Sequence, residues 1–135
     1  MSEIKSIKVQ LSGGEILDCS IAISQAPQWR LNLLGIEGAS EASGKDLYEA
    51  LVVIRQRLEL IGARLLCQGA RREVVPSGMS RDMGGGRLAY VTSLGSSARR
   101  SDLVDIFDRA EPNSVGSVAE QKVFRQNWNS LRKLV

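Results

Sequence analysis

One segment of the chain concentrates residue types that bind anions and protein partners. Between Cys67 and Arg87 the chain holds five glycines, four arginines, two serines and two methionines. Guanidinium groups form paired hydrogen bonds with carboxylates and phosphates, and consecutive glycines let backbone N–H groups approach an anion closely. The two methionines need a surface to pack on, which argues against simple disorder. We predict a partner- or anion-binding site made of Arg71, Arg72, Ser77, Met79, Ser80, Arg81, Asp82, Met83, Gly84, Gly85, Arg87 and Tyr90.

The same composition also fits a flexible, solvated loop between two strands. Loops of more than about a dozen residues in compact domains are usually functional or disordered, and we favour a functional loop. The run Gly84–Gly86 precedes a predicted strand rather than a helix, so it is neither a P-loop nor a dinucleotide-binding fingerprint. If the strands on either side pair, the segment is a hairpin tip and its arginines share one surface.

The positive charge of the chain is concentrated in one region. From Arg64 to Arg100 there are seven arginines and two carboxylates, a net charge of +5, whereas the whole chain carries +3. Arg99 and Arg100 are predicted either to face the same surface as the segment or to be simply solvated. Three aspartates at intervals of three residues could ligate a divalent cation, although we favour a solvent-facing stripe: Asp102, Asp105 and Asp108.

The composition excludes several kinds of catalysis. The chain has no histidine, which removes Ser-His and Cys-His nucleophilic pairs and histidine-ligated metal sites. Two cysteines cannot build a structural zinc site. We predict that the protein is not an enzyme and needs no cofactor or metal, and that Cys19 and Cys67 are buried, reduced thiols.

Apolar alternation predicts three strands at the start of the chain. They cover residues 7–11, 17–23 and 29–33, with turn chemistry at Ser12–Glu15 and a break at Ala26–Pro27. Short turns join such strands most simply into an antiparallel meander. The stretch Gly35–Gly44 is predicted to be a loop.

Helical spacing of apolar residues predicts a long helix over residues 45–61. Ser43 and Asp46 stand at capping-box spacing, Gly62 is the predicted stop, and the core face carries Leu51, Ile54 and Leu58. Strands are predicted at 64–68 and 88–92, a short helix capped by Ser101 at 101–107, and a loop at 108–116. The capping box Ser117–Glu120 then opens a last helix, whose apolar face is Phe124, Trp128, Leu131 and Val135.

These elements predict one α+β domain over residues 1–135. Its small antiparallel sheet of about five strands packs against one long helix and the C-terminal helices. Apolar residues make up 43% of the chain but aromatics only 4%, so the core is aliphatic, with Trp29 and Trp128 in it or at its edge. No run of 18 apolar residues occurs and the start of the chain lacks a signal-peptide stretch, so we expect a cytoplasmic protein without membrane contact.

The C-terminal half carries a resemblance. The stretches Cys67–Arg72, Ser77–Gly84, Ala89–Tyr90 and Leu103–Phe107 resemble a pattern in small bacterial proteins, some of which resemble immunity proteins encoded beside polymorphic or contact-dependent toxins. The resemblance implies a cytoplasmic antitoxin that binds a cognate toxin domain and has no catalytic activity. Immunity proteins against nucleases are often acidic and this chain is basic, so the toxin implied here is not a basic nuclease or is itself acidic.

We therefore expect a protein-interaction module, with toxin neutralisation as its most specific form. The alternatives are a nucleic-acid or nucleotide-binding domain that uses segment 69–87 and, with less support, an enzyme that uses arginine, Asp82 and Tyr90. Against nucleic acid, no aromatic residue for base stacking precedes Tyr90 in the basic segment. The sequence does not give the oligomeric state.

Overall fold

A computed structural model describes residues 3–25, 28–36 and 41–133, and it has the predicted α+β class. The first sheet is antiparallel in the order β4-β3-β2-β1-β5. Its strands are β1 (Glu3–Gln10), β2 (Ile16–Ser24), β3 (Trp29–Leu34), β4 (Glu41–Gly44) and β5 (Arg64–Leu65).

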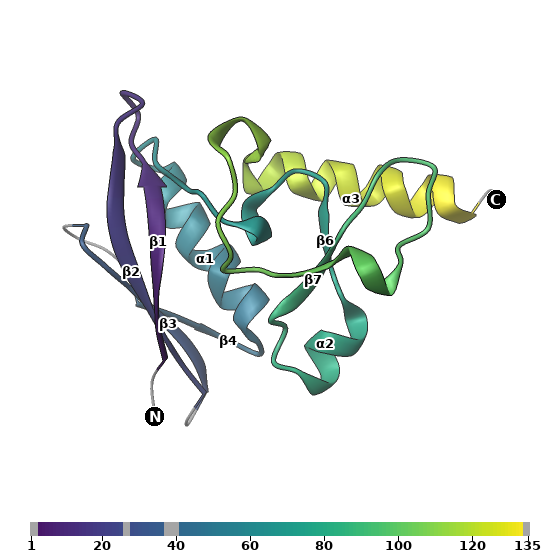
Figure 1. The fold of residues 1–135 in the computed structure, drawn as a ribbon, viewed down its shortest axis with the longest axis horizontal. Helices are drawn as coiled ribbons and strands as arrows, with labels where there is room; N and C mark the ends of the chain where they lie inside the picture. The colour runs from purple at the N-terminus through teal and green to yellow at the C-terminus, as the bar shows by residue number, and fades with distance from the viewer. Residues whose placement is uncertain (1–2, 26–27, 37–40, 134–135) are drawn as a thin grey trace.

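A second antiparallel sheet has the order β6-β7-β8. It consists of β6 (Val74–Pro76), β7 (Leu88–Val91) and β8 (Leu103–Asp105). The helices are α1 (Leu47–Glu59), α2 (Gly78–Met83) and α3 (Val118–Lys133), with 3₁₀ turns η1 (Gln68–Ala70), η2 (Arg100–Asp102) and η3 (Pro112–Ser114). Figure 1 shows α1 against the first sheet, whereas α3 runs beside the second sheet toward the C-terminus.

The predicted three-strand meander is confirmed. Ile7 lies opposite Cys19 and Ile21 lies opposite Leu33, so the alternating apolar side chains share one face. That face is buried against α1, and the buried cluster continues into the second sheet through Val74. The predicted break at Ala26–Pro27 lies outside the described residues.

The core face of α1 is as predicted, but its ends are not. Leu51 and Ile54 have no exposed surface and Leu58 is 2% exposed. The N-cap is Asp46, not Ser43, since the Asp46 carboxylate accepts the Glu49 backbone N–H at 2.8 Å. Ile61 lies beyond the helix and is exposed, and Gly62 follows with φ +75°. The expectation of one long helix is not confirmed, because α1, α2 and α3 have 13, 6 and 16 residues.

The pairing of the later strands differs from the prediction. The predicted strand 64–68 shortens to β5 and pairs with β1, whereas the predicted strand 88–92 is β7, in the other sheet. The fifth strand of the first sheet is instead β4, in the stretch 35–44 that was predicted to be a loop. Only Ala42 of β4 is buried, so the strand has no apolar alternation that would reveal it.

The predicted helix at 101–107 is wrong. Ser101 and Asp102 belong to η2, Leu103–Asp105 form β8, which pairs with β7, and Ile106 and Phe107 lie in the turn that follows. Short apolar runs cannot be assigned to helix or strand by spacing alone, and here the open edge of β7 supplies the backbone partners. Ile106 and Phe107 do face inward as predicted, since they are 0% and 1% exposed. The predicted loop at 108–116 contains η3.

The capping box at the start of α3 is confirmed. The Ser117 N–H donates to Glu120 Oε1 at 2.8 Å, and the Glu120 N–H donates to Ser117 Oγ at 3.0 Å. On the predicted apolar face Trp128 is buried, Phe124 is partly buried, and Leu131 is 38% exposed. Val135 lies outside the described residues.

A buried polar network joins α1 to η1, β6 and α3. The Arg55 side chain is 3% exposed and donates to Gln121 Oε1 at 2.6 Å, to the Gly116 carbonyl at 3.1 Å and to the Gly69 carbonyl at 3.3 Å. Gln121 Nε2 donates to the carbonyls of Gly69 and Arg71 at 2.9 Å and of Val74 at 3.2 Å. Burial lowers the pKa of the Arg55 guanidinium, so these acceptors stabilise a charge that the interior disfavours.

Both cysteines are buried and unpaired, as predicted. Cys67 has no exposed surface, and its burial raises the pKa of the thiol to about 11. In the described part of the chain no helix is long and apolar enough to cross a membrane.

We predict that Leu51→Ala lowers the free energy of unfolding by about 2–5 kcal/mol, because the buried side chain leaves a cavity when it is truncated. Leu60→Ala is the matched control, since Leu60 is 86% exposed and its loss should change stability by about 0.5 kcal/mol or less. Urea denaturation measures both. Equal losses from the two variants would contradict the assignment of the α1 core face.

Candidate functional site

The segment 69–87 is not a hairpin tip. It contains part of η1, then β6 and α2, and the strands on either side of it, β5 and β7, belong to different sheets. Its arginines consequently do not share one surface. Arg71 and Arg72 lie beside the segment that leads into α3, whereas Arg81 contacts the start of α1 and Arg87 contacts β1.

Arg71 and Arg72 are used within the fold. Arg71 forms an ion pair with Glu73, to which its Nε donates at 2.8 Å, and its Nη1 donates to Gln68 Oε1 at 2.9 Å. Arg72 donates to the carbonyl oxygens of Val115 at 3.1 Å and Asn113 at 2.7 Å. The Arg71 guanidinium thus joins two side chains of its own segment, and the Arg72 guanidinium holds the backbone around η3 in place.

Arg81 stabilises the start of α1. Its Nε donates to Asp46 Oδ2 at 2.7 Å, and its guanidinium carbon lies 5.4 Å from the centre of the Tyr48 ring. The Asp46 side chain is 5% exposed, so its charge depends on this partner and on the cap hydrogen bond to α1. The predicted anion ligand of Arg81 is thus supplied by the chain itself.

The glycine run serves close packing rather than an open anion cradle. Gly85 and Gly86 have φ of +71° and +75°, and the Gly85 carbonyl accepts the Leu47 N–H at 2.6 Å. A Cβ at Gly85 would lie 2.5 Å from the Trp29 ring, and one at Gly86 would lie 2.8 Å from the Asp46 carboxyl carbon. The N–H groups of Gly84 and Gly86 both donate to the Ser80 carbonyl, at 2.7 and 2.9 Å. The run lets the end of α2 approach the start of α1.

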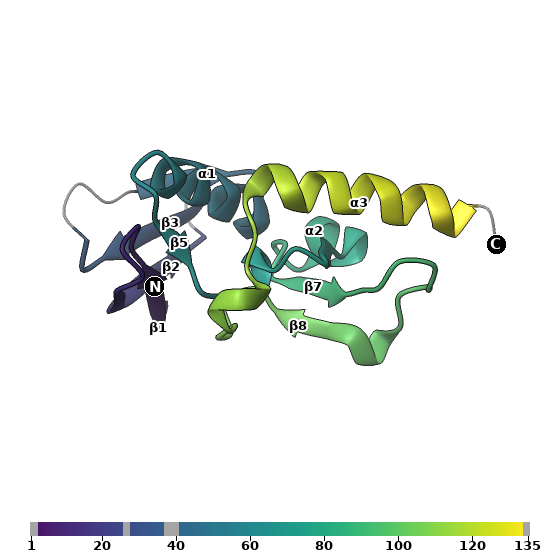
Figure 2. The ribbon, with the colours of Figure 1, turned by 90° about the horizontal axis from the view of Figure 1, so that it is seen from above.

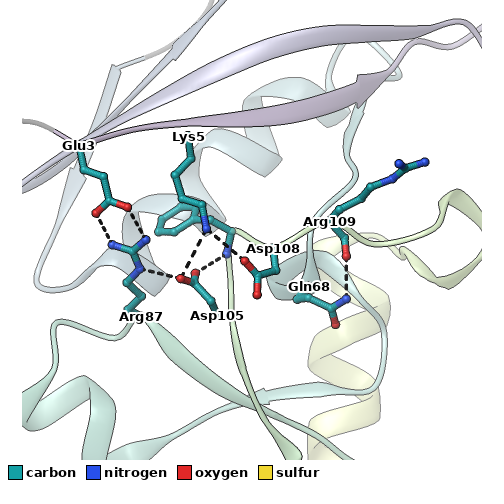
Figure 3. A network of polar contacts seen from close by, with 8 residues as sticks. Glu3, Lys5, Gln68, Arg87, Asp105, Asp108 and Arg109 are labelled. Atoms are coloured by element: carbon teal, nitrogen blue, oxygen red, sulfur yellow. Dashed lines mark hydrogen bonds and ion pairs between the residues drawn. The ribbon is translucent and has the colours of Figure 1, made fainter.

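Arg87 lies in a network of ion pairs that joins β1 to the second sheet (Figure 3). Its Nη1 and Nη2 donate to the two carboxylate oxygens of Glu3 at 2.6 and 2.7 Å, and its Nε donates to Asp105 at 2.9 Å. Lys5 Nζ lies 3.1 Å from Asp108 Oδ1 and 3.7 Å from Asp105 Oδ2. The hydrogen bonds from Arg87 hold the pKa of the Glu3 carboxyl below its ordinary value of 4.5.

The two predicted serines are buried hydrogen-bonding groups of α2. Ser77 Oγ accepts the Ser80 N–H at 3.2 Å as the N-cap, and Ser80 Oγ accepts the Leu88 N–H at 3.0 Å. Ser77 is 4% exposed and Ser80 is 8% exposed. The Ser77 hydroxyl therefore caps α2, and the Ser80 hydroxyl fixes α2 against β7.

The aspartate stripe does not form a metal site. Asp105 and Asp108 pair with Arg87 and Lys5, and Asp102 accepts the Arg99 N–H at 2.9 Å. Because β8 replaces the predicted helix, the three carboxylates do not line one helical face. Among the residues that the structure describes, no group of three metal-ligating side chains is found.

Three predicted site residues remain on the outside of α2. Met79 and Met83 are 73% and 85% exposed, and Asp82 is exposed between them. Leu88, at the start of β7, is 41% exposed. We call Met79, Asp82, Met83 and Leu88 the α2 surface. A hollow of about 240 Å³ lies at the C-terminal end of α2, lined in part by Gly84, Trp29, Leu47, Ile23, Glu3 and Arg87.

Tyr90 lies apart from this surface, in a cavity between β7 and α3. The α3 residues that line it are Arg125, Trp128 and Asn129. Trp128 was predicted to lie in the core or at its edge, whereas Arg125 and Asn129 are not among the predicted site residues. Their signal was the helical spacing i, i+3, i+4, which places all three on one side of a helix.

Comparison with models of known protein families and with curated proteins finds no match for this chain.

We predict that Arg81→Ala lowers the free energy of unfolding by about 1.5–3 kcal/mol, because it leaves the Asp46 carboxylate buried without its cation. Arg100→Ala is the control, since the Arg100 side chain is exposed and has no ion-pair partner among the residues described. Thermal and urea denaturation measure both. If Arg81→Ala were as stable as the control, Arg81 would be free for an external ligand.

Proposed function

We propose that the protein is a protein-binding module that docks its partner on the α2 surface. The observation that carries the proposal is the exposure of Met79 and Met83, four residues apart on one side of a helix. Large apolar side chains that lie together on a protein surface usually mark an interaction site. Methionine is enriched at protein interfaces because its flexible side chain adapts to many shapes.

The hollow beside α2 supports the same proposal. Binding energy at interfaces concentrates where an anchor side chain fills a pocket that has apolar walls. The partly exposed Trp29 lines the hollow, and Gly84, which follows Met83 in the chain, lines it too. The Glu3–Arg87 pair at its rim offers both a hydrogen-bond acceptor and donors to a partner.

In its most specific form, the proposal is that the partner is a bacterial toxin domain and that binding neutralises it. The resemblance of the C-terminal half to immunity-type proteins supports this form. Internal pairing of Arg71, Arg81 and Arg87 with carboxylates also reduces the charge that segment 69–87 presents. The toxin that we propose therefore does not have to be acidic. The proposal assigns no catalytic activity to the protein. It also includes a cytoplasmic location, which the two reduced thiols support.

We predict that Met79→Ala combined with Met83→Ala weakens binding of the partner by about a hundredfold, because both anchors are lost. The melting temperature should change little, since both side chains are exposed. The partner is captured from the native host on immobilised wild-type protein and identified by mass spectrometry. Binding of the purified partner is then measured by calorimetry.

Leu60→Ala combined with Ile61→Ala is the matched control, an exposed apolar pair beyond the end of α1. Unchanged binding of the α2 double variant would place the docking surface elsewhere. The immunity form has a separate test: the captured protein should arrest growth when expressed alone, and co-expression of this chain should restore growth. A captured partner that does not arrest growth would contradict the proposal of toxin neutralisation but not the proposal of a protein-binding module.

The nucleic-acid alternative has less support, because three of the four arginines in the segment are paired with carboxylates. We predict that binding to duplex DNA or RNA is weak and falls steeply with salt, as purely electrostatic binding does. Fluorescence anisotropy between about 50 and 200 mM salt measures this dependence. Submicromolar, sequence-specific affinity at physiological salt would instead favour the nucleic-acid function.

A further inference from the structure

The α2 surface carries a carboxylate that the fold leaves unpaired. Asp82 is exposed, and its carboxylate has no ion-pair or hydrogen-bond partner among the residues that the structure describes. Asp82 follows Met79 by three residues in α2, a spacing that places the two side chains next to each other on a helix. In Figure 1, α3 lies above β7 and α2 lies below it, and in Figure 2 α2 lies beside β7. The outer side of α2, with Asp82 on it, is therefore left to solvent.

The arginines around α2 are already neutralised by the chain itself. Arg81 Nε lies 2.7 Å from a carboxylate oxygen of the α1 N-cap, and Arg87 pairs with one carboxylate on β1 and another on β8. Two arginines are thus set against four carboxylates around α2, which are Glu3, Asp46, Asp82 and Asp105. The exposed Lys45, at the start of α1, narrows this difference without reversing it. Segment 69–87 is basic when its residues are counted along the chain, but the surroundings of α2 are acidic.

Docking on the α2 surface removes water from Asp82. A partner that packs on Met79 and Met83 also covers the carboxylate that lies on the same side of the helix. A charge that loses its water without gaining a partner opposes binding strongly. A cation on the partner removes this penalty and adds a charge-assisted hydrogen bond. Arginine suits the position best, because its guanidinium binds both oxygens of a carboxylate and its stem packs on apolar side chains.

Building on the proposed function, we propose that the partner is basic where it meets the α2 surface. An arginine or lysine of the partner pairs with Asp82, and apolar side chains beside that cation contact Met79, Met83 and Leu88. The charge of the partner is thus opposite to the one that the arginine content of the segment predicts. An acidic protein surface would meet Asp82 with a like charge, which opposes association.

The first test does not depend on the native partner. A random peptide library displayed on phage is depleted on the variant that combines Met79→Ala with Met83→Ala, and is then selected on the immobilised wild-type chain. The peptides that remain are those that need the α2 surface. We expect them to be enriched in arginine and lysine next to aliphatic residues.

The selected peptides are then titrated against two charge variants. Asp82→Asn should weaken their binding by about tenfold, because the charge-assisted hydrogen bond is lost, and should leave the melting temperature unchanged. Glu15→Gln is the matched control, since it removes an exposed carboxylate in the turn between β1 and β2, and it should bind the peptides as wild type does. With the purified native partner, Asp82→Lys should weaken binding by about a hundredfold.

The outcomes separate this proposal from the proposed function. Enrichment of acidic or uncharged peptides overturns the basic partner, as does unchanged affinity of the selected peptides for Asp82→Asn, and both results leave α2 as the docking surface. Tighter binding of the native partner to Asp82→Lys also overturns it and indicates an acidic partner. If no peptide prefers the wild-type chain to the double methionine variant, the docking surface on α2 is itself refuted, and the inference about its charge falls with it.

Discussion

The buried Arg55 guanidinium is the constraint on which the arrangement of the two sheets depends. A charge removed from water destabilises a fold by several kcal/mol unless its donors are satisfied. The carbonyls of Gly69 and Gly116 and the side chain of Gln121 satisfy them, and these acceptors come from η1, the approach to α3 and α3 itself. Displacing any one element leaves the charge short of a partner. Among the described residues, no buried side-chain polar atom lacks a hydrogen bond.

The elements that sequence analysis located correctly are those whose signal is local. Alternation in β1 to β3, helical spacing in α1 and the Ser117–Glu120 capping box each lie within a few neighbouring residues. Of the second sheet only β7 was predicted as a strand, because all three strands are three or four residues long. Strands of that length carry too few apolar positions to show a period, and the open edges of their neighbours determine their conformation.

The candidate site was only partly predictable, for a related reason. Residue types correctly marked segment 69–87 as unusual, but the carboxylate partners of Arg81 and Arg87 are distant in sequence, since they are Asp46 and Glu3. Counting charges along a chain does not reveal which charges meet after folding. The Gly84–Gly86 run misled in the same way, because the groups that approach it are the Trp29 ring and the Asp46 carboxyl group of the chain itself rather than an external anion. Of the predicted polar groups, Tyr90 lies in a cavity beside an arginine that has no partner in the described chain.

The burial of Cys67 makes the rate of its chemical modification a measure of how often the core opens. The thiol lies in the core close to the charge of Arg55, it has no exposed surface, and its high pKa keeps it protonated. A thiol reagent can therefore reach it only during rare fluctuations that part α1 from η1. Cys19 lies in β2 and responds to fraying of the first sheet instead. The modification rates of the two native cysteines thus report on two different opening motions. Cys67 reports on the junction between the sheets, and Cys19 reports on the three-strand meander.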